Sequence, residues 1–282
     1  MRSKREPCVQ VKTRAQLAKM HEAGQVVASA LRAAADAAAP GVATADLDAI
    51  ASAQIAAAGA APSFLGYHGF PATICTCINE EIVHGIPSAS RVLREGDVVS
   101  IDCGASVDGW HADAALTVGL PGVSDELATL IADCEQALWR GLAAARPGAR
   151  LSDISHAVER SVRAAGQYGI VEDYVGHGIG SEMHMDPPVP NYGRPGRGPV
   201  LAEGMALAIE PLLVLGSPST RLLDDGWTVV SEDGGWSAHF EHTVAITADG
   251  PWVLTALTGP PAGVLVPAGI VSAPAMHPQT AG

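Results

Sequence analysis

The chain has 282 residues, of which 48% are hydrophobic and 17% charged, so it has ample core-forming material for one large domain or two small ones. A formal net charge of −13 argues against a general nucleic-acid binder, which needs a basic face. No run of about eighteen apolar residues offers a membrane span, and the basic N-terminus lacks the apolar stretch of a signal peptide.

The first half of the chain is predicted to form two helices followed by strands. Thr13 and Gln16 match a capping box that opens an Ala-rich helix, and Pro40 ends that helix. In chain order we expect a disordered lead at 1–10, this helix to about 39, a second helix at about 46–58, a loop at 64–71, a strand near 73–78 and a hairpin at about 98–118.

The second half is predicted to follow the same order. Ser124 is placed to cap a third helix, and Gly166 to end a fourth. We expect these helices at about 125–146 and 152–165, a Gly/His loop at 176–184, a Pro/Gly-rich connection at 187–199, strands near 205–211, 227–230 and 240–247, and an Ala/Pro/Gly-rich disordered tail at 258–282.

Two acidic residues flank the turn of the first hairpin. The pair Asp108-Gly109 between two strand-like runs is a good hairpin signal. This turn places Asp113 opposite Gly104, so Asp113 and Asp102 are diagonal neighbours on one face, roughly 5–8 Å apart. Taken alone, the two acids are equally compatible with a solvated strand face. If the face is buried, carboxylates this close repel unless a proton or a cation lies between them.

The residues of the two halves also repeat. At an offset of 108, Asp102 aligns with Glu210, and at an offset of 128, Asp113 aligns with Glu241. Gene duplication is the economical explanation. Two related hairpins that meet across a pseudo-twofold axis would aim all four acids at one point.

Four carboxylates at one point need positive charge to remain ionised. His177, on the Gly/His loop, is the natural fifth group. Oxygen donors with one imidazole suit a pair of divalent transition-metal ions about 3.5–4 Å apart, and such a pair activates a shared water and polarises a carbonyl. A calcium site, the alternative by composition, rarely recruits a histidine.

Six short motifs occur in a characteristic order: His84-Gly-Ile-Pro, Ile101-Asp102, His111-Ala-Asp113, Gly176-His177-Gly-Ile-Gly followed by His184, Ile209-Glu210-Pro and Phe240-Glu241-His-Thr. Together they resemble type I methionine aminopeptidase over about 11–257. The resemblance implies an α+β pita-bread fold, in which two pseudo-symmetric α/β halves pack helices on a central antiparallel sheet. It implies a single catalytic domain at 11–257 with an internal repeat of about 11–122 and 123–250.

The resemblance implies a role for each of the five candidate metal ligands. Asp102 would chelate one ion, while Asp113 and Glu241 would bridge two ions. His177 and Glu210 would complete the other ion. Glu210 also resembles the proposed general base, although a carboxylate bound to metal has reduced basicity.

Two further histidines and an apolar pocket match positions that contact substrate. His184 matches the residue that hydrogen-bonds the scissile carbonyl, and His84 matches the residue that contacts the scissile-bond nitrogen. An unbranched thioether needs a narrow apolar slot with a polarisable wall. The residues that match this methionine pocket are Tyr67, Phe70, Cys75, Met183 and Trp227.

Three positions depart from the family pattern. Phe70 stands where a tyrosine is common, and Phe64 replaces a small residue at the pocket edge, which predicts a tighter slot. His239 occupies a position usually held by glutamine, two residues before Glu241, and the sequence offers no account of its purpose.

The resemblance implies a metal-dependent aminopeptidase that removes the N-terminal methionine from nascent proteins and peptides. Two alternatives remain. An X-Pro aminopeptidase or prolidase shares the fold and the ligands but usually carries an extra N-terminal domain. A non-catalytic pita-bread binding protein would be expected to have lost ligands.

The five cysteines are odd in number and sparse, which favours reduced thiols in a cytoplasmic protein. We expect a monomer that acts on N-terminal methionyl peptides and has neither a nucleic-acid nor a membrane partner. The sequence leaves open which metal is used (Co, Mn, Fe, Zn or Ni), the preference at the second substrate residue, whether a paralogue exists and whether the protein associates with ribosomes.

Overall fold

The computed structural model describes residues 9–256, and it confirms the four predicted helices. The first eight residues of the predicted lead and the predicted tail at 258–282 lie outside the described residues. The helices are α1 (Arg14–Ala37), α2 (Thr44–Ala57), α3 (Asp125–Ala144) and α4 (Leu151–Ala165). Within residues 9–256, no helix combines the length and the apolar character that a membrane crossing requires.

Local capping fixes where these helices begin. The side chain of Thr13 accepts a 3.3 Å hydrogen bond from the backbone N–H of Gln16, and the Gln16 side chain accepts a 2.7 Å bond from the backbone of Thr13. Ser124 caps α3 as predicted. The second helix begins two residues earlier than predicted, because Asp46 caps it from its third position by accepting the backbone N–H of Ala43.

Antiparallel strands form one central sheet and two small ones. In the described residues the central sheet has nine strands in the order β1-β4-β5-β14-β9-β7-β8, with β2 paired to β4 and β15 to β14. The small sheets run β13-β10-β6 and β11-β12-β3. The bounds are β1 Ala61–Pro62, β2 Ile74–Ile78, β3 Glu81–Val83, β4 Val98–Val107, β5 Trp110–Gly119, β6 Gly169–Ile170, β7 Gly176–Gly178, β8 Met185–Val189, β9 Ala206–Ile209, β10 Leu212–Val214, β11 Thr220–Leu222, β12 Val229–Ser231, β13 Ser237–His239, β14 Glu241–Thr247 and β15 Gly250–Val253, with a short 3₁₀ turn, η1, at Tyr67–Gly69.

The β4–β5 hairpin has the predicted turn and register. Asp108 and Gly109 have φ values of 51° and 76°, and positive values at both central residues are typical of a type I′ turn. Gly104 pairs with Asp113, as the two-residue turn requires. Asp102 and Asp113 therefore lie on the same face of the hairpin.

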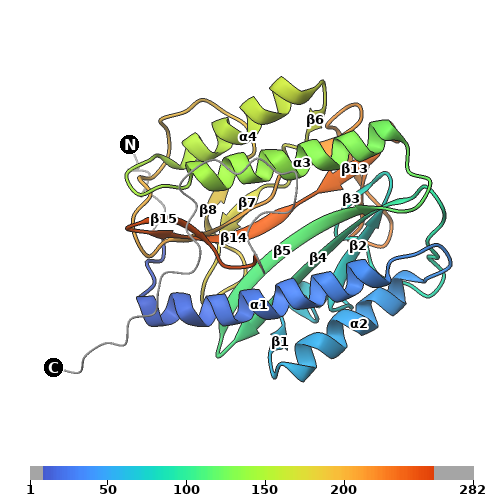
Figure 1. The fold of residues 1–282 in the computed structure, drawn as a ribbon, viewed down its shortest axis with the longest axis horizontal. Helices are drawn as coiled ribbons and strands as arrows, with labels where there is room; N and C mark the ends of the chain where they lie inside the picture. The colour runs from blue at the N-terminus through green and yellow to red at the C-terminus, as the bar shows by residue number, and fades with distance from the viewer. Residues whose placement is uncertain (1–8, 257–282) are drawn as a thin grey trace.

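All four helices cover one face of the central sheet. The α1–α2 pair packs against β4 and β5, where side chains such as Val27 and Ile101 share a core. The α3–α4 pair lies over the part of the sheet that contains β14 (Figure 1). Leu138 of α3 and Ile209 of β9 share a second core there. Because side chains alternate between the faces of a strand, the residues next to these apolar ones point to the opposite face, where the acids lie.

The first three residues of the Gly/His loop predicted at 176–184 are instead strand β7, and the start of the connection predicted at 187–199 is the end of strand β8; residues 179–184 form the connection between these strands. A Cβ at Gly176 would collide with the carbonyl oxygen of Ala208, and one at Gly178 with that of Asp186. Glycine here allows neighbouring backbones to approach closely rather than forming a flexible loop. The sequence pattern did not distinguish these two uses of glycine.

Residues 9 and 10, predicted to belong to a disordered lead, are packed against the rest of the structure. The Gln10 side chain donates a 2.7 Å hydrogen bond to the hydroxyl of Ser181 and accepts one from its backbone N–H at 3.3 Å. Val9 packs against the core beneath α3 and α4. Residues 9 and 10 thus belong to the packed structure. Local sequence patterns did not indicate this, because the partners of these residues lie more than 100 residues away along the chain.

The two halves of the sheet join where β5 lies beside β14. The strand pairing covers only Ala115 with Glu241 and Ala114 with His242. On one side of this pairing, the Thr243 hydroxyl accepts the backbone N–H of Asp113 at 2.9 Å and donates to its carbonyl at 2.8 Å. On the other side, the Thr117 hydroxyl accepts from the N–H of His239 at 2.9 Å and donates to its carbonyl at 2.7 Å. Threonine hydroxyls therefore extend a very short ladder between the halves.

We predict that Thr243→Val destabilises the protein by about 2–4 kcal/mol, because it keeps the side-chain shape but leaves a buried N–H and a buried carbonyl of Asp113 without partners. Urea unfolding monitored by circular dichroism measures the change. Thr129→Val, on the exposed side of α3, is the matched control and should change stability far less. Equal stability of the two variants would show that the Thr243 hydroxyl does not support the join.

Candidate metal centre

Sheet register brings the predicted ligands into two adjacent rows on the face that the helices leave open. In the first row, Asp102 lies opposite Ala115, which lies opposite Glu241. Glu210 follows Ile209, which pairs with His242, so Glu210 extends the same row.

In the second row, His177 lies opposite Ala208, which lies opposite Thr243, and Thr243 is bound to the backbone of Asp113. Small side chains at Ala115 and Ala208 leave space above the sheet between the acids. The pairing of four strands thus gathers residues that are far apart in the chain.

The five candidate ligands converge as the sequence predicts. Asp102, Asp113 and Glu241 each offer an oxygen within 4.8 Å of the others, and His177, Glu210 and Glu241 form a second group with the same spacing. The Nε2 atom of His177 lies 3.7 Å from Oε1 of Glu210. Glu241 belongs to both groups, so two adjacent cation positions share a carboxylate.

The carboxylates are buried and mutually repulsive. Burial, followed by the charges of Asp113 and Glu210, raises the pKa of Asp102 well above its usual range. Burial raises the pKa of Asp113 to about 7. Burial and then the charge of Asp113 raise the pKa of Glu210 to about 8. Burial, followed by the charges of Asp113, Glu210 and Asp102, raises the pKa of Glu241 well above its usual range. A divalent cation at this point would relieve the strain of holding four negative charges together.

Unpaired atoms mark where such cations fit. Oδ1 of Asp102, Oδ1 of Asp113 and Oε1 of Glu241 are buried without a hydrogen-bond partner. Buried carboxylate oxygens are normally hydrogen-bonded or bound to a metal. A donor set of four carboxylates and one imidazole suits divalent transition ions. The residues present therefore fit a metal centre.

His177 is prepared to be a ligand. Its Nδ1 atom lies 2.9 Å from the carbonyl oxygen of Gly178 and must donate to it, which leaves Nε2 as an unprotonated acceptor facing Glu210. Burial lowers the pKa of His177 to about 4, so the imidazole stays neutral. A backbone carbonyl that orients a histidine in this way is the usual support of a metal-bound imidazole.

A cavity of about 290 Å³ opens beside the acids. The structure places every predicted site residue on its wall, together with Phe64, which the sequence placed at the pocket edge. His239, His68 and Val83 also line it, although the sequence did not assign them to the site. His239 lies two residues before Glu241, so the alternation of side chains along an extended segment could have identified it as a neighbour of that carboxylate. No local signal marked His68 or Val83.

The apolar part of this cavity is the predicted side-chain pocket. Phe70 packs edge-on against Trp227 with ring centroids 5.1 Å apart. Phe64 is 7% exposed and lies against Gly104, where a Cβ would approach its ring to 2.8 Å. Gly104 therefore makes room for the larger Phe64 side chain. The cluster consists of Phe64, Phe70, Ala72, Cys75 and Met183, with Tyr67, Ile86 and Trp227 beside it.

The two predicted catalytic histidines line the cavity, and His184 lies close to the candidate ligands. The Tyr67 hydroxyl lies 3.0 Å from Nδ1 of His184, and one nitrogen of His184 lies within 4.8 Å of ligand atoms of Asp113 and His177. Burial, followed by nearby histidines, lowers the pKa of His184 to about 3, so its ring is neutral. His84 has a φ of 61° and its ring lies 6.5 Å from that of Trp227.

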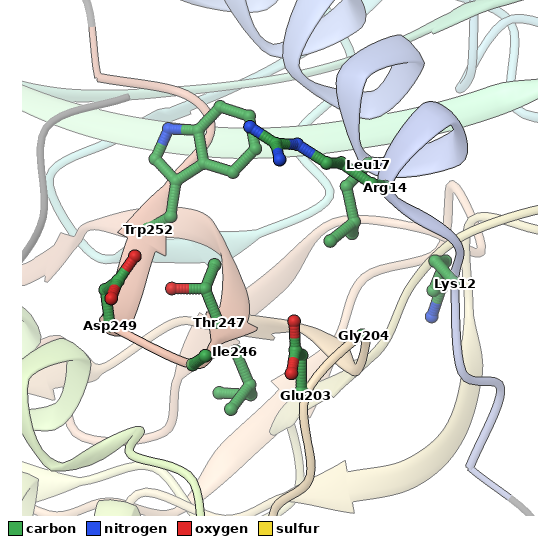
Figure 2. Close-up of a pocket in the computed structure, with 10 residues that line it drawn as sticks. Lys12, Arg14, Leu17, Glu203, Gly204, Ile246, Thr247, Asp249 and Trp252 are labelled. Carbon is green, nitrogen blue, oxygen red and sulfur yellow. The ribbon is translucent and has the colours of Figure 1, made fainter. Parts of the chain in front are cut away.

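A second cavity, of about 430 Å³, lies near the start of α1 (Figure 2). Figure 2 shows side chains from α1, from the turn before β9 and from the β14–β15 hairpin around it, including Arg14, Glu203 and Trp252. None of the predicted site residues lines this cavity, and no candidate metal group of the described residues lies in it. The larger volume therefore does not mark the reactive site.

Comparison with known proteins agrees with this geometry. Residues 18–248 match metallopeptidase family M24. Methionine aminopeptidase 1 of Mycobacterium tuberculosis is 56% identical over 84% of this chain and 91% of its own, and methionine aminopeptidase 1 of Bacillus subtilis is 48% identical over 86% and 98%. The solved methionine aminopeptidase of Thermotoga maritima is 40% identical, with a TM-score of 0.86 over 88% of this chain and 99% of that one. These likenesses confirm the predicted fold.

We predict that the metal-free protein becomes less stable as the pH rises from about 6.5 to about 8. The folded-state pKa values of Asp113 and Glu210, about 7 and about 8, lie above their ordinary values of 3.8 and 4.5. The folded chain therefore binds more protons than the unfolded chain, and stability is lost as these groups ionise.

Histidines with a lowered pKa, such as His177 and His184, act in the opposite direction, but only below their ordinary pKa of 6.5. Urea unfolding of chelator-treated protein at several pH values measures the trend. Saturating Mn²⁺ or Co²⁺ should reverse it, because a cation stabilises the ionised carboxylates. A metal-free stability that is constant or rises over this range would contradict the assignment.

Proposed function

The chain belongs to the methionine aminopeptidases of metallopeptidase family M24, and from this membership we propose how its own residues carry out the reaction. It is a metal-dependent hydrolase that removes the N-terminal methionine from peptides. The single observation that carries the residue assignment is the convergence of four carboxylates and one imidazole, with three carboxylate oxygens unpaired, beside an apolar pocket.

We assign the metal ligands as two overlapping groups. Asp102, Asp113 and Glu241 would hold one divalent ion, and Asp113, His177, Glu210 and Glu241 would hold the second, so that Asp113 and Glu241 bridge. Two such ions would supply a water of lowered pKa and a polarised carbonyl. Glu241 belongs to both groups, and an oxygen of Asp113 lies within 4.8 Å of ligand atoms of Asp102 and Glu241 in one group and of His177 in another, which supports this division.

Glu210 is proposed as the residue that takes a proton from the attacking water. It ends the first row of the sheet beside the candidate cation positions, where metal binding would reduce its basicity but leave it in reach of a bound water. A general base works best when its pKa lies near the working pH. The free amino group of the substrate would meet the acid cluster, which explains a preference for chain ends.

His184 is proposed to donate a hydrogen bond to the scissile carbonyl oxygen as negative charge develops there. In the part of the chain that the structure describes, the Tyr67 hydroxyl has no hydrogen-bond partner other than Nδ1 of His184. If the phenol donates to Nδ1, the neutral ring carries its hydrogen on Nε2, where it can serve as a donor. His84, at the other edge of the cavity, would contact the scissile-bond nitrogen.

The methionine side chain would occupy the aromatic pocket. Rings from Tyr67, Phe70 and Trp227 and the sulfur of Cys75 give it a polarisable wall. Burial raises the pKa of the Cys75 thiol well above its ordinary value, so the thiol is neutral and acts as an apolar surface. Phe64 narrows one side, which favours an unbranched side chain.

A prolidase-type activity has less support. The prolidase of Pyrococcus furiosus is 24% identical, with a TM-score of 0.69, and the match covers 88% of this chain but 66% of that one. A likeness at this identity shows the common fold alone. A non-catalytic binding role has no support, because all five candidate ligands are present and converge.

We further propose that the enzyme works as a monomer in the cytoplasm on nascent chains, where ribosome association would bring it to its substrates. The four cysteines of the described region are free, buried thiols, which suits a reducing compartment. The large exposed apolar side chains of that region are scattered over separate segments, such as Val11, Leu65 and Leu222, and scattered residues of this kind do not require a partner.

The activity is tested with short peptides that vary the first two residues. We expect release of methionine from Met-Ala-Ser in the presence of Mn²⁺, Co²⁺ or Fe²⁺, and loss of release after chelation. Chromatographic detection of free methionine measures it. Preferential cleavage of peptides with proline in the second position would instead indicate the X-Pro class.

The bridging assignment is tested with Asp113→Ala and Glu241→Ala. Each substitution should lower the number of bound metal ions below two per chain and reduce kcat/KM by about 100-fold or more, because the chain loses a shared ligand. Elemental analysis of the purified protein gives the metal content. Glu232→Ala, which alters an exposed acid, is the control. A variant that retains two tightly bound ions would remove that residue from the bridge.

A further inference from the structure

His239 is a buried side chain that the proposed mechanism does not use. It is the last residue of β13, it is 2% exposed, and its Nε2 atom has no hydrogen-bond partner. Leaving a polar atom buried and unpaired costs folding free energy. Such an atom beside a candidate metal centre calls for an explanation, and a functional contact with the centre is one.

The position of Nε2 identifies that partner. It lies 3.9 Å from Oε2 of Glu210 and 3.9 Å from Oε2 of Glu241. The other oxygen of Glu210, Oε1, faces Nε2 of His177 at 3.7 Å. The two oxygens of Glu210 thus face two different imidazoles, one belonging to a candidate ligand and the other to His239.

The main chain holds His239 in this place. The Thr117 hydroxyl binds both its N–H and its carbonyl, and Leu212 of β10 pairs with it from the other side. The imidazole therefore has a fixed base from which to face the carboxylates. The terminal torsion of a glutamate side chain is soft, so Glu210 and Glu241 can turn to close the remaining 1 Å or so that separates 3.9 Å from an N–H···O distance of about 2.9 Å.

We propose that His239 is a positioning residue of the metal centre, whose Nε2–H donates to the outward oxygens of Glu210 and Glu241 while their other oxygens hold divalent cations. This inference rests on the proposed function, because it needs the metal centre to exist. Hydrogen bonds from such supporting groups orient ligating carboxylates, and their loss typically lowers metal affinity 10–100-fold. The imidazole acts through the two glutamates and does not itself touch substrate.

The proposal predicts two effects of opposite sign for His239→Leu. Leucine fills a similar volume without a polar atom, so the metal-free protein should be at least as stable as the wild type, because an unpaired buried donor is removed. Affinity for Mn²⁺ or Co²⁺ should fall about 10–100-fold. If His239 had only a structural role, its replacement by leucine would lower both the metal-free stability and the metal affinity. His239→Gln keeps an N–H donor and should recover most of the affinity.

The experiment uses the full chain, stripped with chelator and titrated calorimetrically with Mn²⁺ or Co²⁺, together with urea unfolding of the metal-free wild type and both variants. Weaker binding by the leucine variant, recovery by the glutamine variant and undiminished metal-free stability would support the proposal. Wild-type affinity in the leucine variant would overturn it.

Two further outcomes separate this inference from the proposed function. Loss of one whole metal equivalent in both variants would overturn the hydrogen-bonding role, because it would make His239 a direct ligand. Failure of the wild-type protein to take up either ion would overturn the metal centre itself, and the inference with it.

Discussion

The repulsion among four buried carboxylates is the constraint on which the rest of this structure depends. Asp102, Asp113, Glu210 and Glu241 are held close together by strand pairing, and burial raises the pKa of each. A cost of this kind persists in a folded protein only when the surrounding structure outweighs it. The apolar cores between the helices and the opposite face of the sheet supply that stability. A bound cation would attract the four carboxylates and so offset their mutual repulsion.

The join between the halves explains why the acids can be placed so accurately. Each half contributes a pair of strands, and the two inner strands, β5 and β14, meet over a short ladder that Thr117 and Thr243 extend. The threonines bind the backbone of His239 and Asp113, so the residues that fix the join also fix the site. Positions on paired strands are more precise than positions on loops. The same threonine hydrogen bonds therefore contribute both to the stability of the molecule and to the geometry of the candidate metal centre.

Around the acids, burial lowers the pKa of His177 and of His239, so both imidazoles stay neutral. A neutral imidazole can accept a metal ion or donate one hydrogen bond, and the second ring nitrogen decides which. The carbonyl of Gly178 fixes His177 as an acceptor, whereas the hydroxyl of Tyr67 contacts His184. A single hydrogen bond at Nδ1 of each ring thus determines the role of its Nε2 atom. His239 differs because its backbone is fixed while Nε2 remains unpaired.

The sequence by itself determined the elements whose signals lie within a few residues of one another. Thr13 and Ser124 marked helix starts, Asp108-Gly109 fixed the register of the β4–β5 hairpin, and the repeat in the sequence aligned Asp102 with Glu210 and Asp113 with Glu241. These patterns and the family motifs predicted the fold and which five ligands would converge. The assigned roles of those ligands, of His84 and of His184 remain predictions.

Only the tertiary structure decided the features that depend on contacts between distant segments. Glycines 176 and 178 read as a loop in the sequence, but they are strand residues because neighbouring backbones approach too closely for a side chain. Gln10 is held by a hydrogen bond to Ser181. The unpaired nitrogen of His239 faces Glu210, which directly follows β9, and Glu241 of β14. Local patterns specify helices and turns through nearby hydrogen bonds, whereas packing across the sheet sets which side chains meet and how closely.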